Sequence, residues 1–517
     1  MEEEEKSDNE LKKKIKKFLD NKWNLLLVLI LLFSFILRLY YFIITSNQVL
    51  FWDSGEYMSM SLHWVKGVFY DFNVQRPPLF PFLIAIFMKL GFGEVVTKFF
   101  LEFIPSMLTV FLSYLIGKEF YNRRTGVAIA LLMSVFWLGL FVSNRLLPDI
   151  PLLFFTLLAV YYFWKGYVKE KKQWYIYLIG LFLGLAFLIK LTAALTGFVF
   201  LAYLLLADRF RFLKSKKLWL SFFILLIVLV PFFVYDKVQF GDPTAFLFGS
   251  HVTDNPAGIS GKPIGWHILG FNCEGKNFCN FFKWFGSELF YILFFIGLLS
   301  FYKLFIGFDL IFKKEGNLKL KADLFMILWL LINLLYFVFL ERDVEDRWLI
   351  PIALPFFYVV YRGIMLIYDL IKKYNRQLAI LAVVSLFLVG SFYELKQADA
   401  SIKSKIDSFA QLKDAGLFIK ENSNENDIVF SKSVPQTTYY AERGVYGIPG
   451  GKEEFISQSR ELKPKYMIVS IFEQHVESIL NFPNEFPNTL VPVQGYFADA
   501  QQTRPVLIIY EFKNYDF

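Results

Sequence analysis

The stretch "NLLLVLILLFSFILRLYYFIITSNQVLFWDSGEY", residues 24–57, begins as an apolar run and ends among acidic and aromatic side chains. An α-helix rises about 1.5 Å per residue, so residues 24–44 are long enough to cross the roughly 30 Å hydrocarbon core of a bilayer. Asp53 and Glu56 follow soon after this run, where a spanning helix meets water. We therefore predict a transmembrane helix over 24–44, followed by a polar site at the membrane surface.

The composition of the whole chain is that of a polytopic membrane protein. Of its 517 residues, 56% are hydrophobic and 20% aromatic, which is too apolar for a soluble protein of this length. The net charge of +8 comes from short Lys and Arg clusters between apolar runs. This pattern marks membrane topology and argues against a nucleic-acid partner. The charged segment 1–23 has no small-residue cleavage site, so we expect residues 24–44 to be an uncleaved anchor.

The sequence contains about eleven apolar stretches of spanning length. They lie near residues 24–44, 98–118, 126–143, 149–165, 174–190, 191–207, 217–235, 288–308, 322–340, 348–368 and 377–394. Basic clusters occupy every second loop, beginning with Lys12 to Lys17, which places the N-terminus in the cytoplasm. The short apolar piece 77–91 starts with two prolines, and we interpret it as a shallow or re-entrant helix.

With this topology, four segments share the outer face of the cell membrane: residues 45–97, 145–149, 237–287 and 341–348. The tail, residues 395–517, joins them and changes in character. Phe409, Leu412, Gly416 and Ile419 have helical spacing, and "DIVFSK", "KYMIVSIF" and "VLIIYEF" are short β-rich runs. We predict a transmembrane domain over 24–394 with interfacial helices, and a small soluble α/β domain over 395–517 outside the cytoplasm.

The two cysteines, Cys273 and Cys279, both fall in the predicted outer loop 237–287. A local disulfide is favoured outside the reducing cytosol, and two free thiols are the alternative. The four histidines are scattered along the sequence and do not indicate a zinc site.

The first outer segment carries the best candidates for chemistry. Asp53, Glu56 and Tyr57 follow the first span, where a carboxylate can stay ionised and serve as an acid or base; a solvated carboxylate or helix cap is the alternative. Arg76 precedes Pro77 and Pro78, which hold it in an extended backbone. A guanidinium matches phosphate oxygens, so a lipid phosphate is a natural ligand, with a snorkelling surface arginine as the alternative.

Three further charged residues lie at the outer ends of later spans. Asp149 opens one span four residues after Arg145, so a simple ion pair between these two is one interpretation. Lys190 has no basic neighbours, which suits either a phosphate ligand or a snorkelling lysine. Arg347 follows "ERDVED" and begins another span, where it is either solvated or at the rim of a site. Ionisable residues at such depth tend to be functional or paired.

The order of these motifs resembles the GT-C glycosyltransferases. An acidic "D..EY" after the first span, a basic residue before "PPL", an Asp opening a later span, and "RWLIPIALP" near the last helices carry the resemblance. It covers most of residues 24–394. The likeness is in particular to bacterial and archaeal members of the protein O-mannosyltransferase and aminoarabinose transferase (ArnT-like) branch. The tail is similar to the outer C-terminal domains of such proteins.

The resemblance implies roles for individual residues. Asp53 would act at the acceptor, Arg76 would hold the donor phosphate, and Asp149 would be the second acidic position. In most of the family a Glu directly follows the first Asp, whereas this chain has Ser54 there. That departure leaves open what Glu56 does and whether a divalent metal is used.

The implied reaction is transfer of a sugar, with inversion, from a polyprenyl-phosphate or dolichyl-phosphate donor to a hydroxyl or similar group. The acceptor would be a glycan, glycolipid or protein; no nucleotide cofactor is expected. Whether the sugar is a hexose or pentose, the carrier length and the oligomeric state are not determined by the sequence. The alternative is a lipid or solute transporter or flippase, but the sequence lacks the two related halves with broken helices typical of one. A scaffold for the tail would not need about eleven spans.

Overall fold

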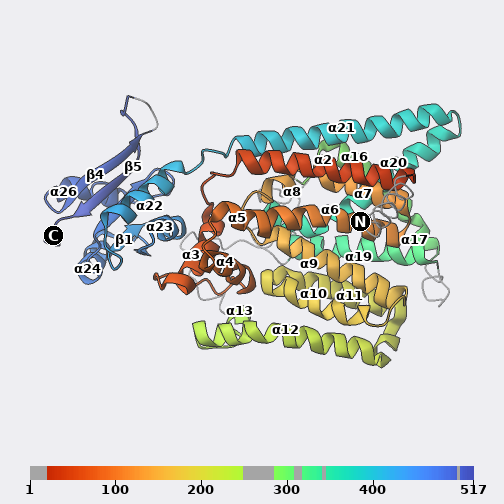
Figure 1. The fold of residues 1–517 in the computed structure, drawn as a ribbon, viewed down its shortest axis with the longest axis horizontal. Coiled ribbons are helices and arrows are strands. Elements are labelled where there is room, and N and C mark those ends of the chain that lie inside the picture. The colour runs from red at the N-terminus through yellow and green to blue at the C-terminus, as the bar shows by residue number, and fades with distance from the viewer. Residues whose placement is uncertain (1–19, 249–284, 308–316, 340–344, 498–500) are drawn as a thin grey trace, which may run out of the picture. The chain divides into compact units, whose positions relative to one another are not determined.

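The computed structural model describes residues 20–248, 285–307, 317–339, 345–497 and 501–517 (Figure 1). The chain divides into two compact units. The membrane unit comprises Met1–Ile43, Phe99–Asn144 and Pro148–Ile402, and the sheet unit comprises Ile44–Lys98, Arg145–Leu147 and Lys403–Phe517.

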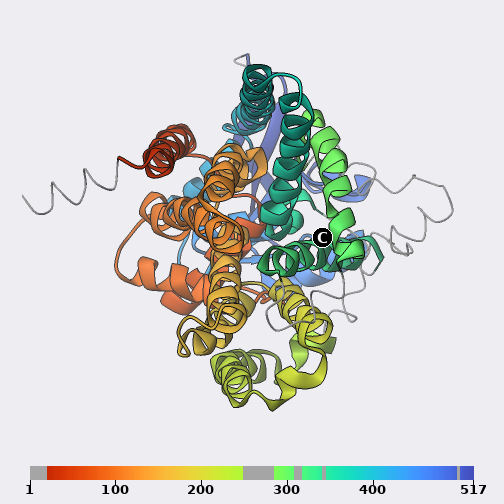
Figure 2. The ribbon, with the colours of Figure 1, turned by 90° about the vertical axis from the view of Figure 1, so that its right-hand side faces the viewer.

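The membrane unit is a bundle of long apolar helices that lie side by side, and Figure 2 looks along them. Several are extended by turns of π-helix (η1, η2) or 3₁₀-helix (η3, η4, η6, η7). The α-helices are α2 (Lys22–Ile44), α6 (Ile104–Phe120), α7 (Arg123–Val135), α8 (Trp137–Val142), α9 (Asp149–Tyr162), α10 (Tyr175–Ile189), α11 (Ala194–Asp208), α12 (Lys216–Phe240), α13 (Ala245–Phe248), α16 (Glu288–Leu298), α17 (Tyr302–Ile306), α19 (Leu318–Phe339), α20 (Ala353–Lys372) and α21 (Arg376–Lys403). The short turns are η1 (Phe99–Phe103), η2 (Phe163–Val168), η3 (Leu191–Ala193), η4 (Arg209–Lys214), η6 (Leu299–Phe301) and η7 (Asp346–Ile352).

Eight helices in the described part of the chain are long and apolar enough to cross a membrane, which confirms the prediction of a multi-pass membrane protein. All eleven predicted spans fall on helices. Three of them are shorter or interrupted: 174–190 corresponds to the 15-residue α10, 288–308 to α16 with η6 and α17, and 126–143 to α7 and α8.

The interruption between α7 and α8 lies at Phe136, whose backbone leaves the helical region (φ −53°, ψ 108°). A break of this kind frees backbone N–H groups, and such groups must be satisfied inside a membrane protein. The Trp137 N–H donates to Oε2 of Glu394 at 3.0 Å, and Oε1 of the same carboxylate accepts from the Ser287 N–H at 2.6 Å. Fully buried Glu394 on α21 therefore closes the gap in α7–α8.

A buried arginine joins three helices of the membrane unit. Arg38 on α2 is only 3% exposed, and its Nε donates to the Ser106 hydroxyl at 2.7 Å. Nη1 donates to the Ser34 hydroxyl at 2.6 Å and to the carbonyl of Ser134 at 3.0 Å. Nη2 donates to the carbonyl of Met133 at 3.3 Å. Neutral oxygens thus satisfy this guanidinium and tie α2 to α6 and α7.

The sheet unit combines the predicted outer segment 45–97 with the tail. Its five-stranded sheet has the order β2-β1-β3-β5-β4; β1 pairs in parallel with β2 and β3, while β5 pairs antiparallel with β3 and β4. Its elements are α3 (Trp52–Lys66), α4 (Leu79–Lys89), α5 (Glu94–Lys98), α22 (Ala410–Asn422), β1 (Ile428–Ser431), α23 (Val434–Ala441), β2 (Gly444–Tyr446), α24 (Lys452–Leu462), β3 (Tyr466–Ser470), α25 (Glu477–Leu480), α26 (Phe482–Glu485), β4 (Leu490–Phe497) and β5 (Pro505–Phe512).

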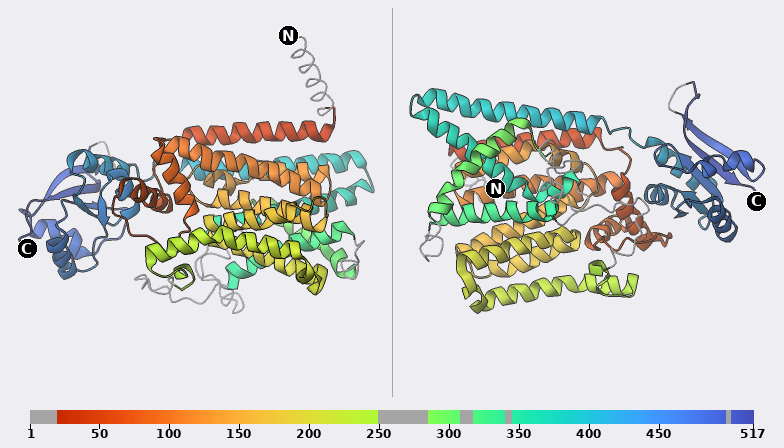
Figure 3. Two further views of the ribbon diagram at one scale, coloured as in Figure 1. Left: turned by 60° about the horizontal axis from the view of Figure 1, so that its bottom comes forward. Right: turned by 180° about the vertical axis from the view of Figure 1, so that it is seen from behind.

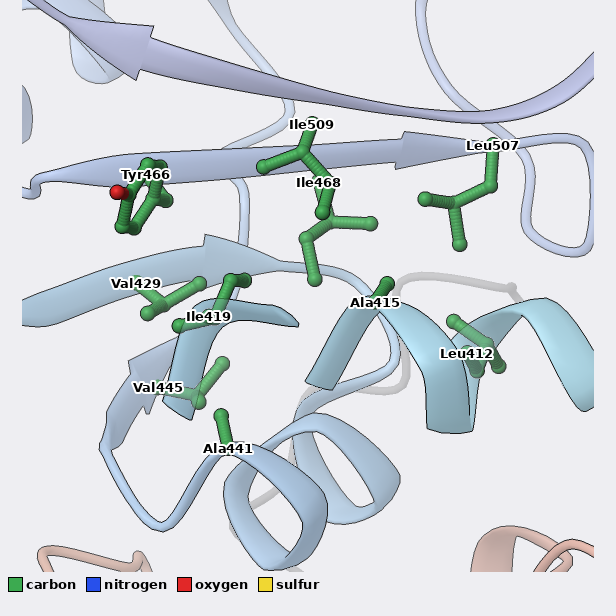
Figure 4. Packing of buried hydrophobic residues seen from close by; sticks show 10 residues of the cluster. All are labelled: Leu412, Ala415, Ile419, Val429, Ala441, Val445, Tyr466, Ile468, Leu507 and Ile509. Atoms are coloured by element: carbon green, nitrogen blue, oxygen red, sulfur yellow. The ribbon is translucent and has the colours of Figure 1, made fainter. Parts of the chain in front are cut away.

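Helix α22 covers one face of this sheet (Figure 4). The core cluster there is built from Leu412, Ala415, Ile419, Val429, Ala441, Val445, Tyr466, Ile468, Leu507 and Ile509. The helical spacing of Leu412 and Ile419 is what aims both at the strands. The prediction of a small C-terminal α/β domain is confirmed.

The segment before the tail packs directly on it within the sheet unit. Helix α3 contacts α23, where the Ser59 hydroxyl donates to the carbonyl of Pro435 at 2.8 Å. A Cβ placed on Gly55 would lie 3.1 Å from Pro435 Cβ, so the close approach favours glycine there. Residues 45–97, predicted as an outer loop of the transmembrane domain, thus group with the tail (Figure 3).

The apolar piece predicted as a shallow or re-entrant helix over 77–91 forms α4. Its 11 residues rise about 16 Å, roughly half of the hydrocarbon core. Cys273 and Cys279 lie outside the described residues, as does most of the loop 237–287.

Candidate functional site

The first candidate cluster starts on helix α3 of the sheet unit. Asp53 lies in the first turn of α3, where a carboxylate is stabilised by the positive end of the helix dipole. Glu56 and Tyr57 follow three and four residues later. Side chains at these spacings share one face of a helix, so the sequence "DSGEY" places all three side by side.

Arg76 reaches this face of α3 from the segment before α4. A turn at Asn73 positions it: the Arg76 N–H donates to the Asn73 carbonyl at 3.0 Å, and the Asn73 side chain accepts from the Gln75 N–H at 3.0 Å. Two prolines then restrict the backbone that leads into α4. The side chain is therefore presented from a constrained stretch.

The guanidinium of Arg76 joins the three side chains on α3. Its Nε donates to Oε2 of Glu56 at 2.6 Å, and Nη2 donates to Oδ1 of Asp53 at 2.8 Å. Nη1 makes a long contact of 3.4 Å with the Tyr57 hydroxyl, and the guanidinium carbon lies 5.3 Å from the centre of the Tyr57 ring. The structure thus brings together Asp53, Glu56, Tyr57 and Arg76.

The cluster is partly shielded from water but not sealed. The side chains of Asp53, Glu56 and Arg76 are 18%, 10% and 21% exposed. Burial raises the pKa of the Glu56 carboxyl; the charge of Arg76 lowers it and that of Asp53 raises it, and the net shift is upward. With both carboxylates ionised, one arginine faces two negative charges. One of the two negative charges is therefore not neutralised by Arg76, and a carboxylate in this state can accept a proton.

Two neighbours of Glu56 carry no signal of their own in the sequence. The Asn73 side chain lowers the pKa of the Glu56 carboxyl, against the larger effect of burial. Burial raises the pKa of Tyr70 well above its ordinary value, and the charge of Glu56 adds to that rise. Asn73 stands three residues before Arg76. Asn is common in turns for unrelated reasons, so its presence there does not by itself indicate a site.

The C-terminal tail contacts both ends of helix α3, in part through the segment "YYAER". The Leu50 N–H, just before α3, donates to the Tyr440 hydroxyl at 3.0 Å. Glu442 pairs with Lys66 at the end of α3 and with Lys420 on α22, both at 2.7 Å. The Phe69 ring stacks on a tyrosine of β2 with the ring centres 4.9 Å apart. The α/β domain therefore holds both ends of α3.

The second candidate cluster lies in the membrane unit and joins three segments. Asp149 opens α9 and is 1% exposed; its Oδ1 accepts from Nζ of Lys190, which follows α10, at 2.6 Å. The Lys190 ammonium also lies 5.7 Å from the centre of the Trp348 ring, within the range of a cation–π contact. Oδ2 of Asp149 is buried and has no hydrogen-bond partner among the described residues. The partner of Asp149 is thus Lys190, and this carboxylate has a free acceptor atom.

Arg347 stands next to Trp348 in η7. Its Nε donates to Oε2 of Glu345 at 2.5 Å, and the Arg347 side chain is 16% exposed. In the motif "RWLIPIALP", Trp348 contacts Lys190, whereas the sequence pattern points to Arg347 as the candidate. An aromatic residue at the start of a span is usually an interfacial anchor, so nothing in the sequence singled it out.

Among the described residues, no cluster of three or more His, Cys, Asp and Glu side chains could hold a metal ion. Both carboxylates of the first cluster face Arg76.

Comparison with solved structures decides the fold. The apo ArnT of Cupriavidus metallidurans superposes with a TM-score of 0.62 at 13% identity, over 95% of this chain and 98% of that one. The oligosaccharyltransferase AglB of Archaeoglobus fulgidus, solved with an inhibitory peptide and a dolichol-phosphate, gives 0.62 at 14% identity, over 97% and 75%. The chain has the GT-C fold. The GT-C likeness extends to C. metallidurans ArnT bound to undecaprenyl phosphate (TM-score 0.56, 13% identity, 93% and 97% covered).

The sequence itself gives a narrower match. The family described as dolichyl-phosphate-mannose-protein mannosyltransferase matches residues 75–235, less than a third of the chain. This segment of the GT-C fold contains Arg76, Asp149 and Lys190. No curated protein sequence matches the chain. Together the family match and the fold support a membrane glycosyltransferase.

Proposed function

We propose that the protein transfers a sugar from a polyprenyl-phosphate-linked donor to an acceptor hydroxyl, on the outer face of the cell membrane. The observation that carries this proposal is the cluster in which Arg76 bridges Asp53 and Glu56. It supplies a proton acceptor and a cation in a chain with the GT-C fold. The relatives of that fold solved with dolichol-phosphate and undecaprenyl phosphate favour a lipid phosphate as the donor.

In the proposed reaction Asp53 is the general base. Its carboxylate accepts the proton of the acceptor hydroxyl while that oxygen attacks the anomeric carbon from the face opposite the phosphate. The new glycosidic C–O bond forms as the bond from the anomeric carbon to the phosphate oxygen breaks, which inverts the configuration. The lipid phosphate leaves with the bonding electron pair. Because it is stable as an anion, it needs no proton from the enzyme.

Glu56 and Arg76 orient the base in this scheme. Arg76 stays charged because the neighbouring Tyr57, Glu56 and Asp53 raise its pKa by more than burial lowers it. Its hydrogen bond to Oδ1 fixes the orientation of the Asp53 carboxylate. Glu56 shares Arg76 with Asp53, although it stands three residues after Asp53 and not directly after it.

Cations are needed for the departing phosphate, because charge develops on its oxygens as the bond breaks. Among the described residues, the Nη1 group of Arg76 makes only the long 3.4 Å contact with Tyr57, so it is the donor with capacity for a phosphate oxygen. Lys190 and Arg347 are the further candidate cations from the membrane unit. Oδ2 of Asp149, buried without a partner among the described residues, is suited to accept a hydrogen bond from a sugar hydroxyl.

The test uses the purified full-length protein in lipid. Polyprenyl-phosphate mannose, glucose and aminoarabinose are supplied with hydroxyl acceptors, and mass spectrometry follows release of the lipid phosphate. We expect release with one of these donors only when an acceptor is present. Saturable binding of lipids or solutes without breakage of any sugar–phosphate bond would overturn the proposal in favour of a transporter.

A further inference from the structure

A polar cavity of about 460 Å³ lies in the membrane unit where α11 ends and α12 begins. Residues of η2, α10, η4 and α19 complete its wall. Three cationic side chains line it: Arg211, Lys217 and Lys321. The cavity lies at the N-terminal end of α10, whereas Lys190 follows the C-terminal end of the same helix. It is therefore separate from the Asp149–Lys190 pair.

The three cations of this cavity are not paired with any carboxylate in the described part of the chain. Arg211, Lys217 and Lys321 have no hydrogen-bonded or ion-paired side-chain partner there. By contrast, Lys169 and Lys171 of the preceding loop pair with Glu119 at 3.0 and 3.2 Å. Uncompensated cations at a membrane edge attract anions.

Two carboxylates also line the cavity, and only one of them is engaged. Asp208 accepts a hydrogen bond from the Tyr167 hydroxyl, while Glu170 is an exposed loop residue. Three cations against two carboxylates leave a net positive charge. Lys217 also lies in the first turn of α12, where the helix dipole favours a negative ligand.

A second space is an apolar groove of about 570 Å³, and some of its lining residues are next in sequence to those of the polar cavity. It runs between α10, α11 and α12, which lie side by side in Figures 1 and 3. Neighbouring residues line the two spaces: Arg211 faces the polar cavity and Phe212 the groove, and Lys217 and Leu218 divide in the same way. A charged space beside an apolar one matches a ligand that has a charged headgroup and a hydrocarbon chain.

The groove is open along its side. Five of its lining side chains are large, apolar and exposed: Phe198, Leu201, Leu213, Trp219 and Phe222. A Cβ built on Gly197 would have only one atom within 4 Å, at 3.7 Å on Leu183. The groove can therefore admit a hydrocarbon chain from the surrounding bilayer.

We propose that the polar cavity and the groove together bind one anionic phospholipid. Its phosphate-bearing headgroup lies among Arg211, Lys217 and Lys321, and an acyl chain follows the groove. Basic pockets between membrane helices are known to hold anionic headgroups, and the adjoining groove favours a lipid over a soluble anion. Each of the two volumes alone is within the range of small-molecule sites.

The test counts bound lipid by native mass spectrometry of the full-length protein in a non-ionic detergent, titrated with phosphatidylglycerol or phosphatidylcholine. We expect one phosphatidylglycerol to bind with saturation. The triple variant Arg211→Gln, Lys217→Gln, Lys321→Gln should weaken it at least tenfold. The matched control replaces three cations of the same segments that do not line the cavity: Lys214→Gln, Lys216→Gln and Lys319→Gln. It should change affinity less than twofold. Equal losses in both triple variants, or no loss in either, would overturn the proposal.

A second variant tests the groove without touching a charge. Gly197→Leu places a side chain in the open space and should weaken phosphatidylglycerol binding about fivefold, with circular dichroism reporting the fold. Glycerol phosphate, which lacks acyl chains, should neither compete nor raise the melting temperature. If it binds as tightly as the phospholipid, the ligand is a soluble anion and the proposed lipid is wrong.

Discussion

Two shielded arginines of this protein, Arg38 and Arg76, differ in what surrounds them. Arg38 in the membrane unit is 3% exposed and donates to hydroxyl and carbonyl oxygens, all neutral. Arg76 in the sheet unit has a 21% exposed side chain and faces two carboxylates. Arg38 is satisfied by the fold, whereas Arg76 belongs to a group with more negative than positive charge.

This difference shows that depth of burial does not mark a functional charge. A cation that only neutral oxygens surround has a fixed role in packing, because none of its partners changes protonation. Carboxylates near a cation can accept protons, and partial exposure lets a substrate reach them.

The largest expected effect is that of Arg76→Gln. Without the guanidinium, Asp53 loses its fixed orientation and the repulsion between Asp53 and Glu56 is no longer offset. We expect turnover to fall about 10³-fold. The control is Arg504→Gln, an exposed arginine of the same unit, which should change turnover less than twofold. If Arg76→Gln turns over as fast as Arg504→Gln, then Arg76 has no special role in the reaction.

Lys190→Met tests the other carboxylate cluster. It leaves Asp149, which is 1% exposed, without its cationic partner, at a cost of about 3 kcal/mol in unfolding free energy. Asp149→Asn should cost less, and the double variant should recover most of the loss. Thermal unfolding in detergent gives the three values. Additive effects of the two substitutions would show that the pair is not coupled.

Arg38→Gln should affect stability and leave the chemistry intact. The hydroxyl of Ser106 and the carbonyls of Met133 and Ser134 lose their charged donor, which costs about 1–3 kcal/mol. The melting temperature should fall while turnover per folded molecule stays within twofold of the wild type. A variant that is stable but inactive would give Arg38 the kind of role that we assign to Arg76.

The smallest effect concerns the pH dependence of stability at Glu56. Its pKa in the folded protein is raised above the ordinary 4.5, so folding takes up a proton in the window that begins near pH 4.5 and ends at the raised value. The stability of the wild type relative to Glu56→Gln should therefore fall as pH rises through this window. Melting curves at half-unit steps from pH 4 to pH 8 measure the difference. If it grows with pH, the Arg76 ion pair outweighs burial.

Much of the membrane architecture could be predicted from composition, because a helix that crosses a bilayer needs a long apolar run. The same argument fails where a span is interrupted. Nothing in residues 126–143 indicates the break at Phe136, since the Glu394 carboxylate that satisfies Trp137 is over 250 residues away in the sequence. The grouping of residues 45–97 with the tail also depends on contacts distant in sequence, such as Ser59 with Pro435.

The candidate site could be predicted only in part, because local spacing determines only some of its contacts. Asp53, Glu56 and Tyr57 share a face because their spacing is helical, and that much is local. The contact with Arg76 requires the turn at Asn73 and the return of the chain, which no local pattern specifies. The pairing of Asp149 with Lys190 joins two helices across about 40 residues, so sequence spacing favoured the nearer Arg145.

The role of the Asp53 cluster as the reaction centre is tested by measuring lipid-phosphate release by Asp53→Asn beside wild type and Asp414→Asn. Asparagine keeps the size of Asp53 and an oxygen for Arg76, but it is not a base. Asp414 is an exposed residue of α22, so its variant controls for the loss of a carboxylate in the same unit. We expect Asp53→Asn to remain folded, with release at least 100-fold slower than wild type, and Asp414→Asn to release normally. Near-normal release by Asp53→Asn would contradict the assignment of this cluster as the reaction centre.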